Sequence, residues 1–114
     1  MTLIPSQMLK GVLQGSVLAI LGQRETYGYE IVQDLTAYGF GHIAEGTVYP
    51  LLLRLEKSGL VSARFASSGT GPRRKYYALT ERGREELAAF RASFREMTAA
   101  VARLPGFGEE EEGR

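Results

Sequence analysis

Apolar residues recur every three or four positions along most of the chain, which is the spacing of one face of an α-helix. This pattern predicts a first helix over residues 6–21, ended by Gly22. A second helix is predicted over residues 29–38, where Gly39 and Gly41 break the pattern. The chain is therefore expected to begin with two successive helices.

A third helix is predicted within residues 45–61, EGTVYPLLLRLEKSGLV, and it ends at Gly59. Its inward face is one apolar stripe that consists of Val48, Leu51, Leu52 and Leu55. Its outward face gathers Gly46, Pro50, Leu53 and Lys57, with Thr47 and Arg54 at one edge and Tyr49 and Glu56 towards the other. A helix-interior proline costs a hydrogen bond and an exposed leucine gains nothing from water, so this face is expected to contact another molecule. For Leu53, packing beneath the following hairpin or on a second subunit is an alternative.

Two short strands are predicted next, because apolar and polar residues alternate over residues 61–65 and tyrosines mark residues 75–79. Residues 67–74 between them, SSGTGPRR with the first serine at 67, predict a flexible and basic hairpin tip. Helix, helix, helix and hairpin is the order of a winged helix-turn-helix. The fold class expected is therefore mainly α with a small β-hairpin.

The last helix is predicted to begin after Thr80, which is a good N-terminal cap. Its apolar residues are spaced alternately by three and four, as in a coiled coil: Leu87, Phe90, Phe94, Met97, Val101 and Leu104. So long a seam predicts helix-to-helix packing, either on the first helix of the same chain or on a second copy. We expect both, with Met8 and Val12 of the first helix joining the interface of a homodimer.

Charge is unevenly distributed, although the net charge of the 114 residues is only +1. Residues 54–84 hold eight basic and two acidic residues, a local charge of +6 (8 − 2), while residues 109–112 are four glutamates. A positive cluster on a third helix and wing favours a polyanionic partner, and double-stranded DNA is the one that this fold binds. The alternative is a winged helix used as a protein-interaction module, without sequence-specific DNA binding.

Several other classes are disfavoured. The chain has no cysteine, no signal-peptide pattern and no membrane-length apolar run, so a cytoplasmic protein without a membrane partner is expected. His42 is the single histidine and has no recognisable catalytic companions. We therefore expect no enzymatic activity, no catalytic residue, no metal site and no cofactor.

Three segments resemble the PadR family of bacterial transcriptional regulators: YGYEI (27–31), EGTVYPLLLRLEKSGLV (45–61) and GPRRKYYALTERGREEL (71–87). The resemblance extends over roughly residues 8–104, and the single last helix is similar to the compact branch of the family. It implies a dimeric repressor whose Thr47 and Tyr49 lie at the DNA backbone. Many relatives have serine and proline where this chain has Ala44 and Glu45, so the start of the third helix lacks a good cap.

The expected organisation is a winged helix-turn-helix domain over residues 1–80, a dimerisation helix over residues 81–105 and a disordered acidic tail over residues 106–114. The expected DNA-binding residues are Gly46, Thr47, Tyr49, Pro50, Leu53, Arg54, Lys57, Arg73, Arg74 and Lys75. The expected dimer interface consists of Met8, Val12, Leu87, Phe90, Phe94, Met97, Val101 and Leu104. A two-fold dimer predicts a pseudo-palindromic operator. The resemblance also makes the dimer interface a candidate site for a flat hydrophobic effector, although the chain lacks the tryptophan that such relatives often use.

Overall fold

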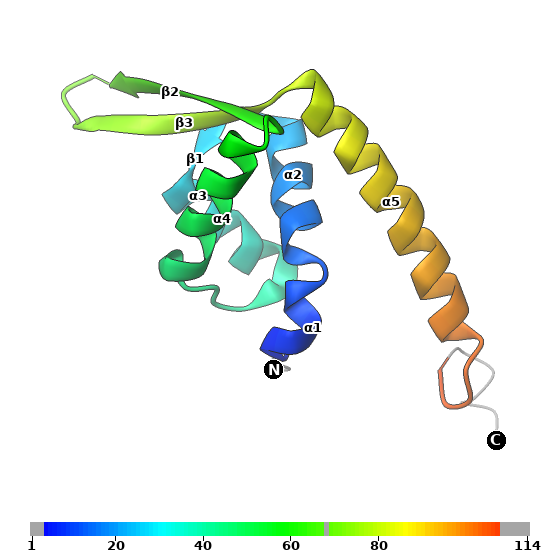
Figure 1. Ribbon diagram of the computed structural model, residues 1–114. Helices are drawn as coiled ribbons and strands as arrows, with labels where there is room; N and C mark the ends of the chain where they lie inside the picture. The colour runs from blue at the N-terminus through cyan, green and yellow to red at the C-terminus, as the bar shows by residue number, and fades with distance from the viewer. Residues whose placement is uncertain (1–3, 68, 108–114) are drawn as a thin grey trace.

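The computed structural model describes residues 4–67 and 69–107 and shows a helical body that carries a small sheet (Figure 1). In chain order the elements are α1 (Ser6–Lys10), α2 (Leu13–Gln23), β1 (Thr26–Tyr27), α3 (Gly28–Leu35), the π-helical turn η1 (Thr36–Phe40), α4 (Glu45–Lys57), β2 (Val61–Ser67), β3 (Arg73–Leu79) and α5 (Glu81–Ala102). This order confirms the expected class, mainly α with a β-hairpin. Within the described residues, no helix is both long enough and apolar enough to cross a bilayer.

The prediction of one continuous helix over residues 6–21 is wrong, because the structure divides this segment into α1 and α2. The amide of Gly11 donates to the carbonyl of Met8 at 3.3 Å and that of Val12 to Leu9 at 3.0 Å, so the chain tightens into a turn there. The predicted stop at Gly22 is also wrong, since α2 continues to Gln23. Gly22 instead lies against Leu87 of α5, where a Cβ would be 3.2 Å from a leucine methyl.

The core lies between α2, α3, α4 and the inner face of the sheet. The stripe predicted on α4 is confirmed, since Val48, Leu51, Leu52 and Leu55 are all buried. It packs with fully buried residues of α2 and α3, among them Leu18 and Ile31. Gly59 adopts the left-handed conformation expected after α4, with φ +78°. The inward side of α4 is thereby fixed, and its other side faces solvent.

The sheet has three antiparallel strands in the order β1-β3-β2, one more than expected. β1 has two residues, Thr26 and Tyr27, and is too short to leave a pattern in the sequence. The β2–β3 hairpin is the wing, which extends beyond the helices on the side opposite α5 (Figure 1). The predicted extent of its tip is wrong, because Arg73 and Arg74 are already in β3, paired with Ser67 and Ala66.

The expected cap of α5 is confirmed, since Thr80 Oγ1 accepts a hydrogen bond of 3.0 Å from the amide of Gly83. Close packing then joins α5 to α2: the ring of Phe90 covers Gly15, and Leu87 is buried. The C-terminal half of α5 runs away from the body (Figure 1). It ends at Ala102 and not at residue 105, so Leu104 lies in the following turn. The glutamates at 109–112 lie outside the described residues.

Candidate nucleic-acid interface

The outward face of α4 is exposed as the sequence predicted. The seven α4 residues expected to bind DNA are all exposed: Gly46, Thr47, Tyr49, Pro50, Leu53, Arg54 and Lys57. Leu53 is 51% exposed, so the wing does not cover it. The same helix therefore buries one side in the core and exposes the other, with its apolar and basic residues, to solvent.

The start of α4 lacks a side-chain cap, in agreement with the expectation for Ala44. Ala44 is the N-cap residue and provides no side-chain acceptor, and Glu45 is the first helical residue. The next position, Gly46, is open, because a Cβ placed there would have no atom within 4 Å. A neighbouring molecule can therefore approach the backbone of the first turn closely, on the side away from the core.

Arg54 and Lys57 supply the free positive charge of α4. In residues 4–67 and 69–107 neither side chain forms an ion pair, whether with the nearby Glu45 and Glu56 or with any other carboxylate. Glu56 instead accepts from Lys75 of β3, with Nζ 3.0 Å from Oε1. Both α4 cations are thus available to an external anion.

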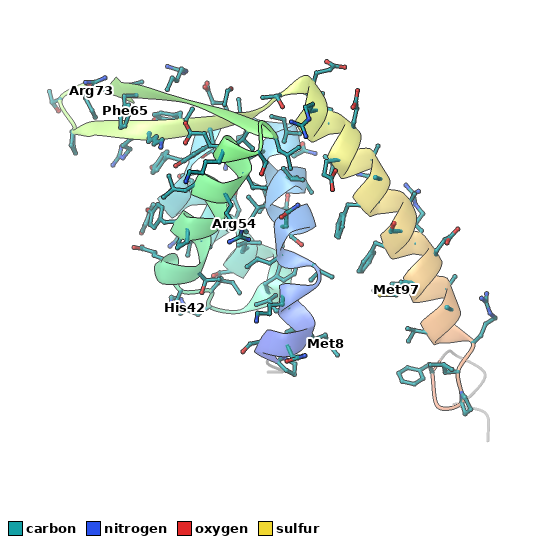
Figure 2. The ribbon with its side chains drawn as sticks, viewed as in Figure 1. Met8, His42, Arg54, Phe65, Arg73 and Met97 are labelled. Carbon is teal, nitrogen blue, oxygen red and sulfur yellow. The ribbon has the colours of Figure 1, made fainter. Side chains whose placement is uncertain are left out.

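The inner face of the wing holds Lys75 and Arg73 beside aromatic rings. Lys75 Nζ lies 5.4 Å from the ring centroid of Tyr77, and the hydrogen bond with Glu56 raises the pKa of Lys75. Arg73 stacks over Phe65 at 5.4 Å near the end of the wing, where Figure 2 shows both side chains away from the helices. Arg73 carries the freer charge of the two, because Lys75 is already neutralised by Glu56.

The outer face of the wing presents Arg74. Its guanidinium lies over the ring of Tyr27 at 4.7 Å. Arg64, on the same face, is bound by Glu25 through hydrogen bonds of 2.7 and 2.8 Å, and these lower the pKa of the Glu25 carboxyl. The basic wing residues therefore divide between two faces, and two of them, Arg64 and Lys75, already have an acidic partner.

A notch of about 350 Å³ lies where α3, α4 and the wing meet, and the sequence analysis did not identify it. Its lining residues are Tyr27, Gly28, Tyr29, Tyr49, Arg74, Lys75 and Tyr77. Tyr49 is 40% exposed, and burial first and the charge of Glu45 second raise its pKa. Tyr29 is also exposed beside it, so YGYEI contributes to this surface. The sequence signal was present, but only the fold brings that segment against α4.

The expected dimer residues divide into two groups. Leu87 is buried and Phe90 is partly buried on α2 of their own chain, so assigning Leu87 to the dimer interface is wrong. Met8, Val12, Phe94, Met97 and Val101 border an apolar groove of about 630 Å³ between α1 and the distal half of α5, and Leu104 does not line it. This apolar groove is lined by Ile4, Met8, Val12, Phe94, Met97, Thr98, Val101, Ala102 and Phe107. Figure 2 shows Met8 on the side of α1 towards α5 and Met97 on the side of α5 towards α1.

The single histidine, His42, is not part of a metal-binding cluster within the described residues. His42 lies beside Lys10 and Thr47 in a shallow pocket between α1 and the start of α4. Within residues 4–67 and 69–107, no group of three histidine, cysteine, aspartate or glutamate side chains is placed to hold a metal ion. The exposed face of α4, the wing and the notch are thus the features that a function must explain.

Comparison with known proteins relates the chain to regulators of transcription. The family model described as "Transcriptional regulator PadR-like family" matches residues 17–89, which include all three segments quoted above. A PadR-like transcriptional regulator from Bacillus cereus has 45% identity and a TM-score of 0.81, over 90% of this chain and 99% of that one. Bacillus subtilis PadR in complex with operator DNA has 30% identity and a TM-score of 0.63, over 69% and 46%.

Curated relatives agree with these structures. An uncharacterised protein of Lysinibacillus sphaericus is 33% identical over 75% of this chain and 81% of its own length. The negative transcriptional regulator PadR of Bacillus subtilis is 32% identical over 67% of this chain. The match spans 43% of that regulator, so the remainder of it has no counterpart in the comparison.

Proposed function

This chain belongs to the PadR-like family of transcriptional regulators, and from that premise we propose that it is a dimeric repressor that binds a pseudo-palindromic operator. One observation carries the proposal: on the side away from its buried stripe, α4 presents an exposed face on which Arg54 and Lys57 form no ion pair within the described residues. A related protein of known structure is described in complex with operator DNA, and a curated relative is named a negative regulator. Repression by this chain is the corresponding expectation.

In the proposed complex α4 enters the major groove and the wing follows the adjacent backbone. Thr47 and Tyr49 donate hydroxyl hydrogen bonds to phosphate oxygens, while Arg54 and Lys57 neutralise phosphates. Leu53 contacts a thymine methyl group, which explains an exposed leucine on this face. Gly46 and Pro50 add little side-chain bulk to the exposed side of α4, so the helix can approach the DNA closely. Arg73 and Arg74 act from the wing, and Lys75 binds DNA only when phosphate replaces Glu56.

A second copy completes the proposed repressor by covering the apolar groove. Phe94, Met97 and Val101 are substantially exposed on one side of α5, and Met8 faces them from α1. Burial of apolar surface contributes about 25 cal/mol per Å², so covering these residues stabilises the dimer by several kcal/mol. A two-fold axis through this contact would present two α4 helices to two half-sites. The same groove is large enough to hold a flat hydrophobic effector, which would act on the dimer that binds DNA.

Duplex binding measured against salt tests the proposal. We expect binding at low salt that weakens steeply as salt rises, by a slope of about 0.9 for each phosphate neutralised. Fluorescence anisotropy with genomic fragments gives the affinity and the slope. A winged helix used only for protein interactions would show no duplex binding in dilute buffer, so that result would contradict the proposal.

Two substitutions on α4 distinguish contact with the DNA backbone from recognition of the bases. Tyr49→Phe removes a hydroxyl that contacts phosphate, so it is expected to weaken binding about tenfold for all sequences alike. Leu53→Ala removes an apolar contact with a base, so it is expected to change which bases are preferred. Competition binding with randomised duplexes measures both effects. A uniform loss from Leu53→Ala would remove Leu53 from the base-reading face.

A further inference from the structure

Gly28, the first residue of α3, lies directly against the ring of Tyr49 on α4. A Cβ placed on Gly28 would overlap Cε1 of that ring and would be 2.8 Å from Cζ and 2.9 Å from Cδ1. Carbon atoms that are not bonded do not approach one another so closely. The tyrosine ring therefore occupies the space that the side chain of any other residue at position 28 would need.

The backbone gives no reason for glycine at this position. The glycines with positive φ are Gly39, Gly41, Gly59, Gly69 and Gly106, and Gly28 is not among them. Alanine would be favoured over glycine in a helix by roughly 0.5–1 kcal/mol. Room for the Tyr49 ring is thus the physical reason for glycine at the start of α3.

The phenol of Tyr49 is partly buried and is affected by groups on α4 and on the wing. Glu45 lies one turn earlier on α4 and Tyr77 lies on β3, and both, after burial itself, raise the pKa of the Tyr49 phenol. A phenol keeps its proton at neutral pH even at its ordinary pKa, so the Tyr49 hydroxyl can donate a hydrogen bond. The exposed part of the side chain borders the notch, beside Arg74 and Tyr29.

We propose that Gly28 is a positioning residue that holds the Tyr49 hydroxyl at the notch, where it meets a backbone phosphate of duplex DNA. The inference rests on the proposed function, since it assigns Gly28 a part in the same DNA contact. Arg74 supplies positive charge at the same notch from the wing. A methyl group at position 28 would displace the ring while leaving the α3 backbone free to keep its conformation.

The test compares Gly28→Ala, Tyr49→Ala and the double variant with the unaltered full chain. The probe is a mixed-sequence duplex of roughly 30 base pairs, about three helical turns, in dilute buffer. Gly28→Ala and Tyr49→Ala are each expected to weaken binding about tenfold, the value of a lost phosphate contact. The double variant should match Tyr49→Ala within about twofold, because the ring through which Gly28 acts is absent.

Gly11→Ala is the matched control, because a Cβ there would lie 3.7 Å from the nearest atom, the Met8 carbonyl oxygen. It should bind the duplex like the unaltered chain. Thermal unfolding checks that each variant is folded. If Gly28→Ala unfolds by itself, the double variant identifies the cause, because Tyr49→Ala removes the ring from the space beside position 28. Recovery of folding in the double variant shows that the side chain at position 28 and the Tyr49 ring compete for that space.

Nuclear magnetic resonance of tyrosine-labelled protein without DNA supplies a second measurement. Gly28→Ala should shift the Tyr49 ring resonances, and Gly11→Ala should leave them in place. Unchanged Tyr49 resonances, or losses of affinity that add in the double variant, would overturn the role of Gly28. If the unaltered chain binds the duplex and Gly28→Ala binds equally well, the inference alone fails. If the unaltered chain ignores the duplex, the proposed function fails and takes the inference with it.

Discussion

Replacement of Phe94 and Met97 by glutamate is expected to convert the protein into monomers and to weaken operator binding by roughly 100-fold, the avidity lost when two linked half-site contacts become one. Both side chains are exposed on the groove side of α5 in the isolated chain, at 39% and 49%. A second copy would bury them, and an unpaired carboxylate in that contact costs several kcal/mol. Sedimentation equilibrium measures the assembly, and anisotropy with an operator fragment measures the affinity.

Ala92→Glu combined with Ala99→Glu is the matched control for this pair. Both alanines are exposed on α5, and the helical spacing places them on the face opposite the seam. The control adds the same two negative charges to the same helix, so it should remain dimeric. A glutamate pair at 94 and 97 that leaves the dimer intact would place the contact between copies elsewhere on the molecule.

Charge reversal on α4, Arg54→Glu with Lys57→Glu, is expected to weaken duplex binding by at least about 100-fold, because each charged contact contributes about 1.5–3 kcal/mol. The two side chains are exposed and form no ion pair in residues 4–67 and 69–107, so the change breaks no ion pair there. The salt dependence should also become shallower by about 1.8, since two phosphate contacts disappear. Anisotropy titrations at several salt concentrations measure both quantities.

Arg84→Glu with Arg95→Glu is the control for the reversal on α4. These arginines are exposed on α5, and their reversal changes the net charge by the same amount. A general electrostatic effect would weaken binding equally in both double variants. Equal losses would therefore contradict a specific role for the exposed face of α4, whereas a loss confined to Arg54 and Lys57 supports it.

The family and the fold class were predictable because their signals are local or repeated. The spacing of Val48, Leu51, Leu52 and Leu55 predicts the apolar stripe on α4, and the burial of all four residues is confirmed. The Thr80 cap and the turn at Gly59 follow from the intrinsic preferences of those residues, and both are present. The resemblance to PadR regulators rests on motifs that all lie within the matched residues 17–89, and it is confirmed.

Other features were not predictable because they depend on contacts between distant segments. The break between α1 and α2 leaves the apolar spacing unchanged, and β1 is two residues long, so neither produces a periodic signal. The local charge of residues 54–84 includes every basic residue equally. In the structure, however, Arg64 is bound by Glu25, which lies 39 positions away in the sequence, and Lys75 is bound by Glu56. Leu87 belongs to the apolar seam in sequence, yet packing on α2 buries it within its own chain.

The amino-acid sequence by itself determined the helix faces, the caps and the family, since each depends on neighbouring residues and their spacing. Only the tertiary structure decided which cations stay unpaired, which apolar residues stay uncovered, and that Gly28 makes room for Tyr49. The physical reason is that burial and ion pairing depend on distance in space, which the chain acquires only when α3, α4 and the sheet close on one core.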